Sequence, residues 1–191
     1  TYSDHNNSFV HIEDRGYQFG DGVYEVFGII NKRIVDYDGH IDRLYNSLKK
    51  IQLNSPLNKK AYFFHIKNLI KKNRIKNGLI YLQITRGVAE RDFKFPNNCR
   101  PSLVIIAKRL PFNDYESNFR NGIKVKTTKD LRWKRVDIKT INLLAPVLAK
   151  QYAADKNCQE AWLIDDNGFI TEGSSSTAWI LKKNILYTTP L

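Results

Sequence analysis

The residues at positions 23–30 constrain the fold of this chain more than any other feature. They form a nearly continuous run of β-branched and aromatic side chains, preceded by three glycines within seven residues, Gly16, Gly20 and Gly22. Such a run is typical of a strand, and glycines just ahead of it allow a tight backbone. Asn31 and Lys32 then predict a turn into residues 33–37. We therefore expect residues 9–37 to form strands broken by turns, with a hairpin at their end.

The apolar positions that follow adopt the helical period. Residues 41–51 and 62–70 carry apolar side chains at spacings of three and four, which predicts two amphipathic helices. Residues 79–86 and 103–108 return to continuous apolar runs, short enough to be buried strands. The first part of the chain is therefore predicted to be mixed α and β.

A polar, irregular segment at 110–122 is the best candidate for a domain boundary. We predict an N-terminal α/β domain over 1–113, a linker over 114–121 and a second, β-rich domain over 122–191. In the second domain the pattern predicts a strand at 123–127, a helix from about Ala145 and four short strands between 161 and 187. The apolar end of the sequence would leave a strand edge uncovered, so we expect a fragment of a longer protein that lacks its C-terminal part.

Composition limits the partners and the location. The formal net charge is +12, but the lysines are scattered and no nucleic-acid-binding motif accompanies them, so a solvated basic surface is favoured over a nucleic-acid-binding module, which stays as a remote alternative. No apolar run approaches the ~18 residues of a membrane span, and a signal peptide is not evident, so we expect a cytoplasmic protein without a membrane partner. Cys99 and Cys158 lack CxxC spacing, and the four histidines form no cluster of metal ligands with them, so we expect no metal site.

Three segments carry residues suited to chemistry. The first is the glycine-rich stretch at 13–26, which a structural loop would also explain. The second surrounds Lys139, a single lysine between apolar residues; burial favours the neutral, nucleophilic amine, although a lysine at the surface or core edge is the alternative. The third, residues 171–177, places hydroxyl groups and backbone donors after Glu172, an arrangement suited to an anion but also common in turns.

Taken together, the ordered motifs carry a resemblance that covers essentially the whole chain. They are RGYQFGDGVYEV at 15–26, HIDRL at 40–44, ITRG at 84–87, DIKTINLL at 137–144, VLAKQ at 147–151 and EGSSS at 172–176. In order and spacing these stretches resemble the D-amino-acid transaminases among the fold-type-IV pyridoxal-phosphate (PLP) enzymes. The resemblance implies a mixed α/β, two-domain fold with a small α/β domain and a larger β-rich pseudo-barrel domain. It also implies PLP in the cleft between the domains and a homodimer as the active unit.

The resemblance assigns cofactor-binding roles to five residues. Lys139 would hold PLP as a Schiff base and move the proton between the substrate and the cofactor. Glu172 would lie beside the pyridine nitrogen and keep it protonated, while Arg43 would bind the phosphate through its guanidinium fork. Ser175 and Ser176 would add hydroxyl or backbone contacts near the cofactor.

The resemblance also implies a substrate-carboxylate site and a reaction. Tyr24 and Arg91 match residues that bind the carboxylate, Arg91 across the dimer interface, but Phe93 stands where the family usually has a histidine. The family also continues beyond Leu191 with strands and a loop that help hold the phosphate. The expected reaction is transfer of an amino group from a D-amino acid such as D-alanine to a 2-oxo acid. Phe93 keeps two alternatives open, a branched-chain L-amino-acid aminotransferase and an aminodeoxychorismate lyase.

Overall fold

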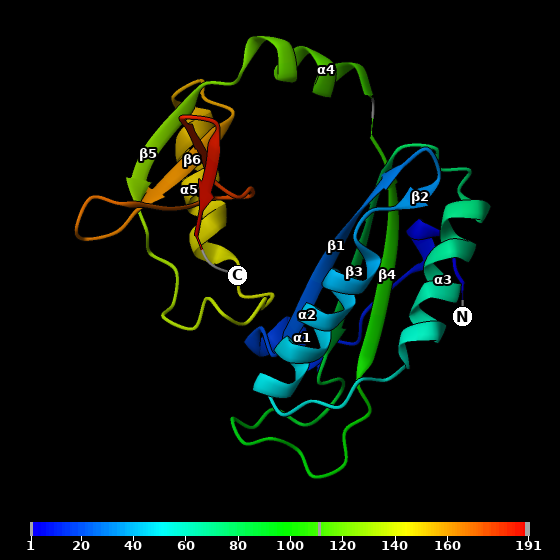
Figure 1. Ribbon diagram of the computed structural model, residues 1–191. Helices are drawn as coiled ribbons and strands as arrows, with labels where there is room; N and C mark the ends of the chain where they lie inside the picture. Colours follow the sequence, from blue (N-terminus) through cyan, green and yellow to red (C-terminus); the bar gives the residue numbers. More distant parts are fainter. Residues whose placement is uncertain (1, 111, 190–191) are drawn as a thin grey trace. The chain divides into compact units, whose positions relative to one another are not determined.

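The chain forms two compact units in its described part. The computed structural model describes residues 2–110 and 112–189, with residues 112–115 described as backbone alone (Figure 1). Unit 1 contains residues 2–110 together with Ile138–Asn142, and unit 2 contains residues 112–137 and 143–189. Ile138–Asn142 therefore packs with unit 1, although the residues on both sides of it belong to unit 2. The domain boundaries expected at 113 and 122 stay a prediction.

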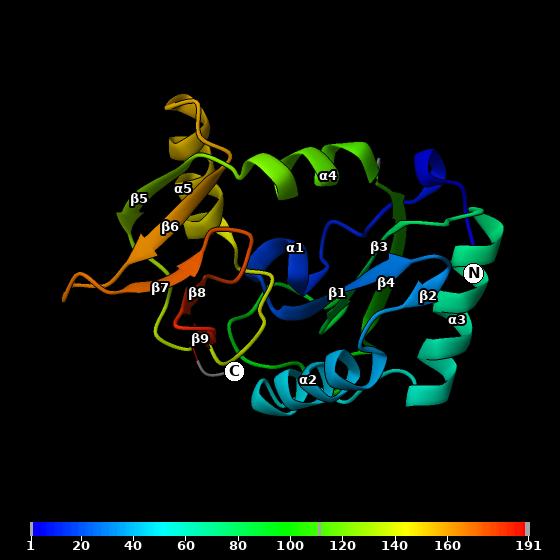
Figure 2. The ribbon, with the colours of Figure 1, turned by 45° about the horizontal axis from the view of Figure 1, so that its top comes forward.

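The described part of unit 1 contains a four-stranded antiparallel sheet with the order β2-β1-β3-β4 (Figures 1 and 2). Its elements are the 3-10 helix η1 (His5–Asn7), α1 (Arg15–Phe19), β1 (Gly22–Ile30), β2 (Arg33–Ile34), α2 (Tyr37–Lys50), α3 (Lys59–Lys72), β3 (Gly78–Thr85) and β4 (Ser102–Arg109). The two amphipathic helices and the two apolar strands predicted after residue 40 are confirmed. The strand β4 is only partly buried because it lies at the edge of the sheet.

The core of unit 1 lies between one face of this sheet and the helices α2 and α3. Val23 and Phe27 of β1 are opposite Ile84 and Ile80 of β3, and all four side chains are fully buried. Alternate residues of a strand share a face, so these positions define the inner face of the sheet. The helices contribute buried apolar side chains at helical spacing, namely Ile41, Leu44, Leu48, Tyr62, Ile66 and Ile70. The helical pattern in the sequence therefore marks the surfaces that pack on the sheet.

The hairpin predicted after residue 30 is confirmed. Ile30 is opposite Arg33, and the turn residues Asn31 and Lys32 have φ values of 48° and 65°. Two successive residues with positive φ are the signature of the type I′ turn, whose twist matches that of the strands.

The expectation of strands throughout residues 9–37 is wrong at α1. The Asp14 side chain accepts a hydrogen bond of 2.8 Å from Gly16 N, and Gly20 ends the helix with φ 67°. An aspartate N-cap and a left-handed glycine at the end are ordinary helix signals. The helix between them has only five residues. It is too short for helical spacing of apolar residues to be seen in the sequence, where the glycines indicate turns.

Unit 2 is built on a βαβ arrangement. Its described elements are α4 (Phe112–Asn121), β5 (Val125–Lys129), α5 (Leu144–Asp155), β6 (Glu160–Ile164), β7 (Ile170–Gly173), β8 (Trp179–Lys182) and β9 (Ile185–Thr188). Strand β6 pairs parallel with β5 and antiparallel with β7, and β8 and β9 form a separate hairpin (Figure 2). A small core of Ala149, Ala153, Ala161 and Leu163 joins α5 to β6. The strands and the helix expected in this region are confirmed.

The polar segment at 110–122, for which a linker is predicted, contains the helix α4. Glu116 and Arg120 form an ion pair of 2.7 Å at the i and i+4 positions. Gly122 follows the helix with φ 71°. The polar side chains of this segment are compatible with a helix that has few apolar contacts, which composition alone does not separate from a loop.

No helix in the described part of the chain is long and apolar enough to cross a membrane. The same residues contain no group of three or more His, Cys, Asp or Glu side chains arranged to hold a metal ion.

Candidate active site

The segment Ile138–Asn142 carries Lys139 to the start of β1. Tyr24 N donates a hydrogen bond of 3.0 Å to Lys139 O, and Ile141 N donates one of 3.2 Å to Gly22 O. A Cβ atom at Gly22 would lie 2.6 Å from Ile84 O and 3.1 Å from the Ile141 side chain. Glycine is therefore required at this position because two backbones approach each other closely there.

The Lys139 side chain lies against Tyr24 in unit 1. Its Nζ atom is 4.6 Å from the centre of the Tyr24 ring, a cation–π distance, and Tyr24 stacks on Tyr81 with ring centres 5.7 Å apart. Lys139 is half-buried, and the preceding Ile138 is buried in the core. The backbone N of Lys139 donates a hydrogen bond of 3.3 Å to the Ser47 hydroxyl of α2. These contacts hold an amine group at a defined position beside a phenol.

A buried carboxylate holds Arg43 at the other side of β1. Arg43 Nε and Nη2 donate hydrogen bonds of 2.6 and 2.8 Å to the two oxygens of Glu25, and His40 Nδ1 lies 2.7 Å from Glu25 Oε2. Glu25 is fully buried. Burial acts to raise the pKa of Glu25, but the hydrogen bonds from Arg43 and His40 outweigh it and lower the pKa below its ordinary value. The bidentate pair fixes the guanidinium and leaves Nη1 outside these bonds.

Arg91 lies in the loop between β3 and β4 and contacts aromatic rings. Its guanidinium carbon is 4.9 Å from the centre of the Phe19 ring and 5.8 Å from that of Phe93, and the two rings are 5.4 Å apart. Both Arg91 and Phe93 are exposed. Phe93 therefore offers Arg91 an aromatic face at the place where a histidine would offer a hydrogen-bond donor.

Glu172 lies near the end of β7 in unit 2, where a short loop begins. Its Oε1 accepts hydrogen bonds of 3.3 Å from Gly173 N and 3.2 Å from Ala178 N. Gly173 N also donates a hydrogen bond of 2.9 Å to Ser176 O. Amides from both ends of the loop at 173–178 thus converge on one carboxylate oxygen, which fixes the Glu172 side chain to the loop.

The hydroxyls of Ser175 and Ser176 point to a second carboxylate. Each donates a hydrogen bond of 2.9 Å to Glu160 Oε2, and the Ser174 hydroxyl donates to Glu160 Oε1. The sequence prediction left open whether these serines offer hydroxyl or backbone contacts to a cofactor. Their hydroxyl protons are directed to Glu160, and their contacts to a cofactor stay a prediction.

A third network supports the strand that carries Glu172. The Thr171 hydroxyl donates 2.7 Å to Asp130 Oδ2, and Arg132 binds both oxygens of Asp130. Burial acts to raise the pKa of Asp130, but the hydrogen bonds from Arg132 and Thr171 hold that pKa at about 2. The connection after β5 is therefore tied to β7 next to Glu172.

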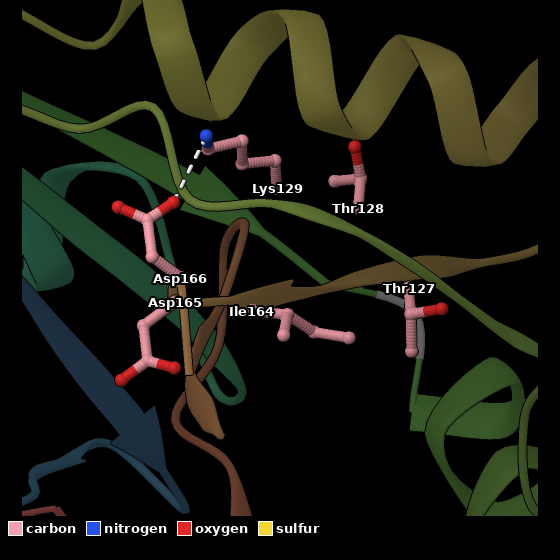
Figure 3. Close-up of a pocket in the computed structure, with 6 residues that line it drawn as sticks. All are labelled: Thr127, Thr128, Lys129, Ile164, Asp165 and Asp166. Carbon is pink, nitrogen blue, oxygen red and sulfur yellow. Dashed lines mark ion pairs between the residues drawn. The ribbon is translucent and has the colours of Figure 1, made fainter. Parts of the chain in front are cut away.

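A surface hollow of about 400 Å³ lies at the ends of β5 and β6, and it contains none of the predicted site residues (Figure 3). Lys129 and Asp166 form an ion pair of 2.9 Å across it, and both side chains are exposed. The Asp165 carboxylate accepts from the backbone N of Asn167 and of Phe169 in the turn between β6 and β7. The charged side chains that line the hollow are thus engaged with each other or with the backbone of the neighbouring turn.

Sequence reasoning did not single out the two buried carboxylates that contact the predicted site residues, Glu25 and Glu160. Glu25 occupies an inward position of β1 between the buried residues Val23 and Phe27, so a single carboxylate in an apolar run was the available signal. Glu160 begins an apolar strand in the same way. A buried carboxylate persists only with partners, so each marks a polar network.

Comparison with known proteins agrees with this description. A D-alanine aminotransferase of Bacillus licheniformis is 41% identical over 182 residues, which are 95% of this chain and 63% of that protein. The branched-chain amino acid aminotransferase of Escherichia coli aligns with a TM-score of 0.84 and 19% identity over 97% of this chain and 64% of that one. A PLP-bound hypothetical aminotransferase from Mycobacterium tuberculosis aligns with a TM-score of 0.81 and 18% identity, over 98% of this chain and 68% of that one.

These likenesses define the class first: the chain has the mixed α/β fold of the fold-type-IV aminotransferases, as the sequence predicted. Residues 22–191 match the family described as Amino-transferase class IV, and the chain belongs to that family. The resemblance to the D-amino-acid transaminases is confirmed by the Bacillus relative, of whose length the chain spans 63%.

Proposed function

We propose that the protein transfers an amino group from an amino acid, most readily a D-amino acid such as D-alanine, to a 2-oxo acid, with PLP as its cofactor. The observation that carries the proposal is the half-buried Lys139 amine, held beside the Tyr24 phenol by the pairing of residues 138–142 with β1. The identity to D-alanine aminotransferases supports the donor class, because it extends over nearly the whole chain.

The residues of each unit fit the chemical groups of PLP. Unit 1 offers the amine of Lys139 and the fixed guanidinium of Arg43, whose Nη1 is outside the bonds to Glu25 and suits a phosphate oxygen. Unit 2 offers the Glu172 carboxylate and the backbone of Ser175 and Ser176. An amine, a guanidinium, a carboxylate and amide donors are the groups that an aldehyde, a phosphate and a pyridine nitrogen require.

When bound, PLP supplies an electron sink for the negative charge that develops at the substrate α-carbon. In this proposal Lys139 is the residue that would hold the cofactor, and its Nζ would accept and return the proton of the substrate α-carbon. Glu172 keeps a proton on the pyridine nitrogen, because a carboxylate next to it stabilises the charged form. The Tyr24 ring, stacked on Tyr81, limits the directions in which Lys139 Nζ moves.

Substrate recognition is proposed to use Tyr24 and Arg91 against the carboxylate that donor and acceptor share, with Arg91 supplied across a homodimer interface. A guanidinium binds a carboxylate in a bidentate way and leaves side-chain selection to other residues. Phe93 contributes a ring to Arg91 instead of a second donor. A branched-chain L-amino-acid substrate is the second candidate, favoured by this missing donor, and an aminodeoxychorismate lyase is the third.

The test uses the full-length protein that contains this chain. We expect a yellow protein that transfers amino groups from a panel of D-amino acids to pyruvate or 2-oxoglutarate, and borohydride reduction followed by peptide mapping should label Lys139. Lys139→Ala should abolish the colour and the transfer, whereas the exposed Lys134→Ala serves as the matched control. A label on another lysine refutes the assignment, and faster reaction with L-amino acids refutes the donor class. Sedimentation of the active protein tests the dimer.

A further inference from the structure

Glu160 is a buried carboxylate to which the proposed chemistry gives no role. It lies at the first position of β6 with 4% of its surface exposed, and it accepts a 2.8 Å hydrogen bond from Ala161 N. The hydroxyls of Ser174, Ser175 and Ser176 all donate to it. A network that satisfies a buried carboxylate with four donors is a built feature of the fold, because an unsatisfied one is costly.

The charge of Glu160 is balanced by a lysine. Lys150 Nζ of α5 lies 3.2 Å from Glu160 Oε1 and 3.0 Å from the Ser175 hydroxyl. Burial acts to raise the pKa of Glu160, but the hydrogen bonds from Ser174, Ala161, Ser175 and Ser176 hold that pKa at about 2. Glu160 is therefore an anion at neutral pH, and it remains an acceptor for every one of these donors.

The direction of these hydrogen bonds determines which donors the serine loop retains. A hydroxyl has a single proton, and those of Ser175 and Ser176 are committed to Glu160. Among the described residues, the backbone N–H groups of Ser175, Ser176 and Thr177 donate no hydrogen bond, whereas Ser174 N donates 2.9 Å to Ala161 O. Three successive backbone donors are thus available to an anionic ligand, and the hydroxyls are not.

The same loop holds Glu172. The two amides that bind Glu172 Oε1, those of Gly173 and Ala178, lie on the two sides of the serines. Gly173 is buried, and a Cβ atom there would lie 2.6 Å from Ser176 O, so the loop is tightly folded at its first residue. A change in the serine positions would therefore move the amides that orient Glu172.

We propose that Glu160 is a positioning residue: by binding the hydroxyls of Ser174, Ser175 and Ser176 it fixes the loop so that backbone amides, not hydroxyls, serve the cofactor and the Glu172 carboxylate stays in place. This inference rests on the proposed function for its link to PLP. The hydrogen bonds from the three serine hydroxyls to Glu160 are a property of the fold, so their effect on the loop can be measured without the cofactor.

The experiment compares Glu160→Gln with Glu116→Gln in the full-length protein. Glu116 lies in the same unit and its ion pair with Arg120 is exposed, so its amide variant controls for the loss of one charge. In Glu160→Gln the amide NH₂ replaces an acceptor that the serine hydroxyls require. Hydrogen exchange of the three hydrogen-bonded amides of the loop, those of Gly173, Ser174 and Ala178, should accelerate at least about tenfold when it is measured on protein stripped of PLP. The dissociation constant of PLP, measured by absorbance, should rise about tenfold, the size of effect seen when a supporting hydrogen bond is lost at other organised sites.

Kinetics separates positioning from simple stability. We expect kcat to fall in Glu160→Gln while KM for donor and acceptor stays within about twofold, because the variant disturbs Glu172 and not the carboxylate site. Ser174→Ala, which removes one hydroxyl and keeps the carboxylate, should show the same changes to a smaller degree and serves if Glu160→Gln does not fold. Combining the two substitutions should cost less than the sum of the separate effects, since both act on one network.

Unchanged exchange of the Gly173, Ser174 and Ala178 amides would show that Glu160 does not fix the loop. Faster exchange with unchanged PLP affinity and unchanged kcat overturns the link to the cofactor. A variant that only melts at a lower temperature, with the same PLP affinity and kcat, overturns it too. If the unsubstituted protein neither binds PLP nor transfers amino groups, the proposed function fails. The exchange experiment distinguishes that result, because it reports on the loop in the absence of any cofactor.

Discussion

The Glu25 network gives the sharpest stability prediction. Glu25→Gln preserves the shape of a fully buried side chain but replaces one of its oxygens with an NH₂ group. The amide still accepts from Arg43 Nε, whereas the bonds that now reach Oε2 from Arg43 Nη2 at 2.8 Å and His40 Nδ1 at 2.7 Å would face another donor. Each charge-assisted hydrogen bond contributes about 1.5–3 kcal/mol, and the relief of burying a charge offsets part of that. We expect a loss of about 3 kcal/mol in the free energy of unfolding.

Urea denaturation of the full-length protein at pH 7 measures this loss, with the exposed Glu116→Gln as a control that should change stability by less than about 1 kcal/mol. The pKa of Glu25 is lower in the folded state than its ordinary value of 4.5. Its contribution is therefore fully present above pH 4.5 and is lost as the pH falls through the folded-state pKa. The difference between wild type and Glu25→Gln should narrow below pH 4.5. A difference under about 1 kcal/mol at pH 7 would refute the reasoning.

Three further predictions follow from single contacts. Gly22→Ala should destabilise the protein by about 2 kcal/mol in urea, because its Cβ would lie 2.6 Å from Ile84 O, whereas Gly28→Ala on the same strand meets its nearest atom at 3.7 Å and should cost less than about 1 kcal/mol. Asp130→Asn should cost about 1–2 kcal/mol at neutral pH. The folded-state pKa of Asp130 is about 2 and its ordinary value is 3.8, so the loss of stability in Asp130→Asn should shrink as the pH falls from 3.8 to about 2. A loss of stability that stays constant across this pH range would contradict the prediction. Phe93→His should lower KM for both carboxylate substrates about threefold by adding a donor near Arg91, which steady-state kinetics on each substrate checks.

Periodicity predicted the larger elements because burial on one face is what forms them. The run at 23–30 became β1, and the apolar spacing at 41–51 and 62–70 became α2 and α3. The pattern failed at α1, a helix of five residues that is too short to show an apolar stripe. In α1 the Asp14 cap and the left-handed Gly20 determine the ends. In α4 a polar sequence is supported by the Glu116–Arg120 pair, a local contact that composition does not reveal.

The lysine was predictable, but its structural neighbours were not. Lys139 stood out as one lysine in an apolar stretch, and the structure shows it half-buried. Its position beside Tyr24 depends on a pairing between residues more than a hundred positions apart, Val23 with Thr140. Short-range patterns contain no information on which strand a distant segment joins. The assignment of Ile138–Asn142 to unit 1 was therefore outside the reach of the sequence alone.

Both missed carboxylates use the same physical device on different units. Glu25 and Glu160 are both buried residues of a strand, and burial of a charge is unfavourable unless several donors converge on it. Glu25 takes those donors from α2 and so fixes Arg43; Glu160 takes them from the serine loop and so fixes the amides around Glu172. In each case the group that holds the site is more deeply buried than the group proposed to touch the cofactor. In each unit a strand therefore positions a buried carboxylate, and that carboxylate positions the helix or loop that carries the proposed cofactor-binding groups.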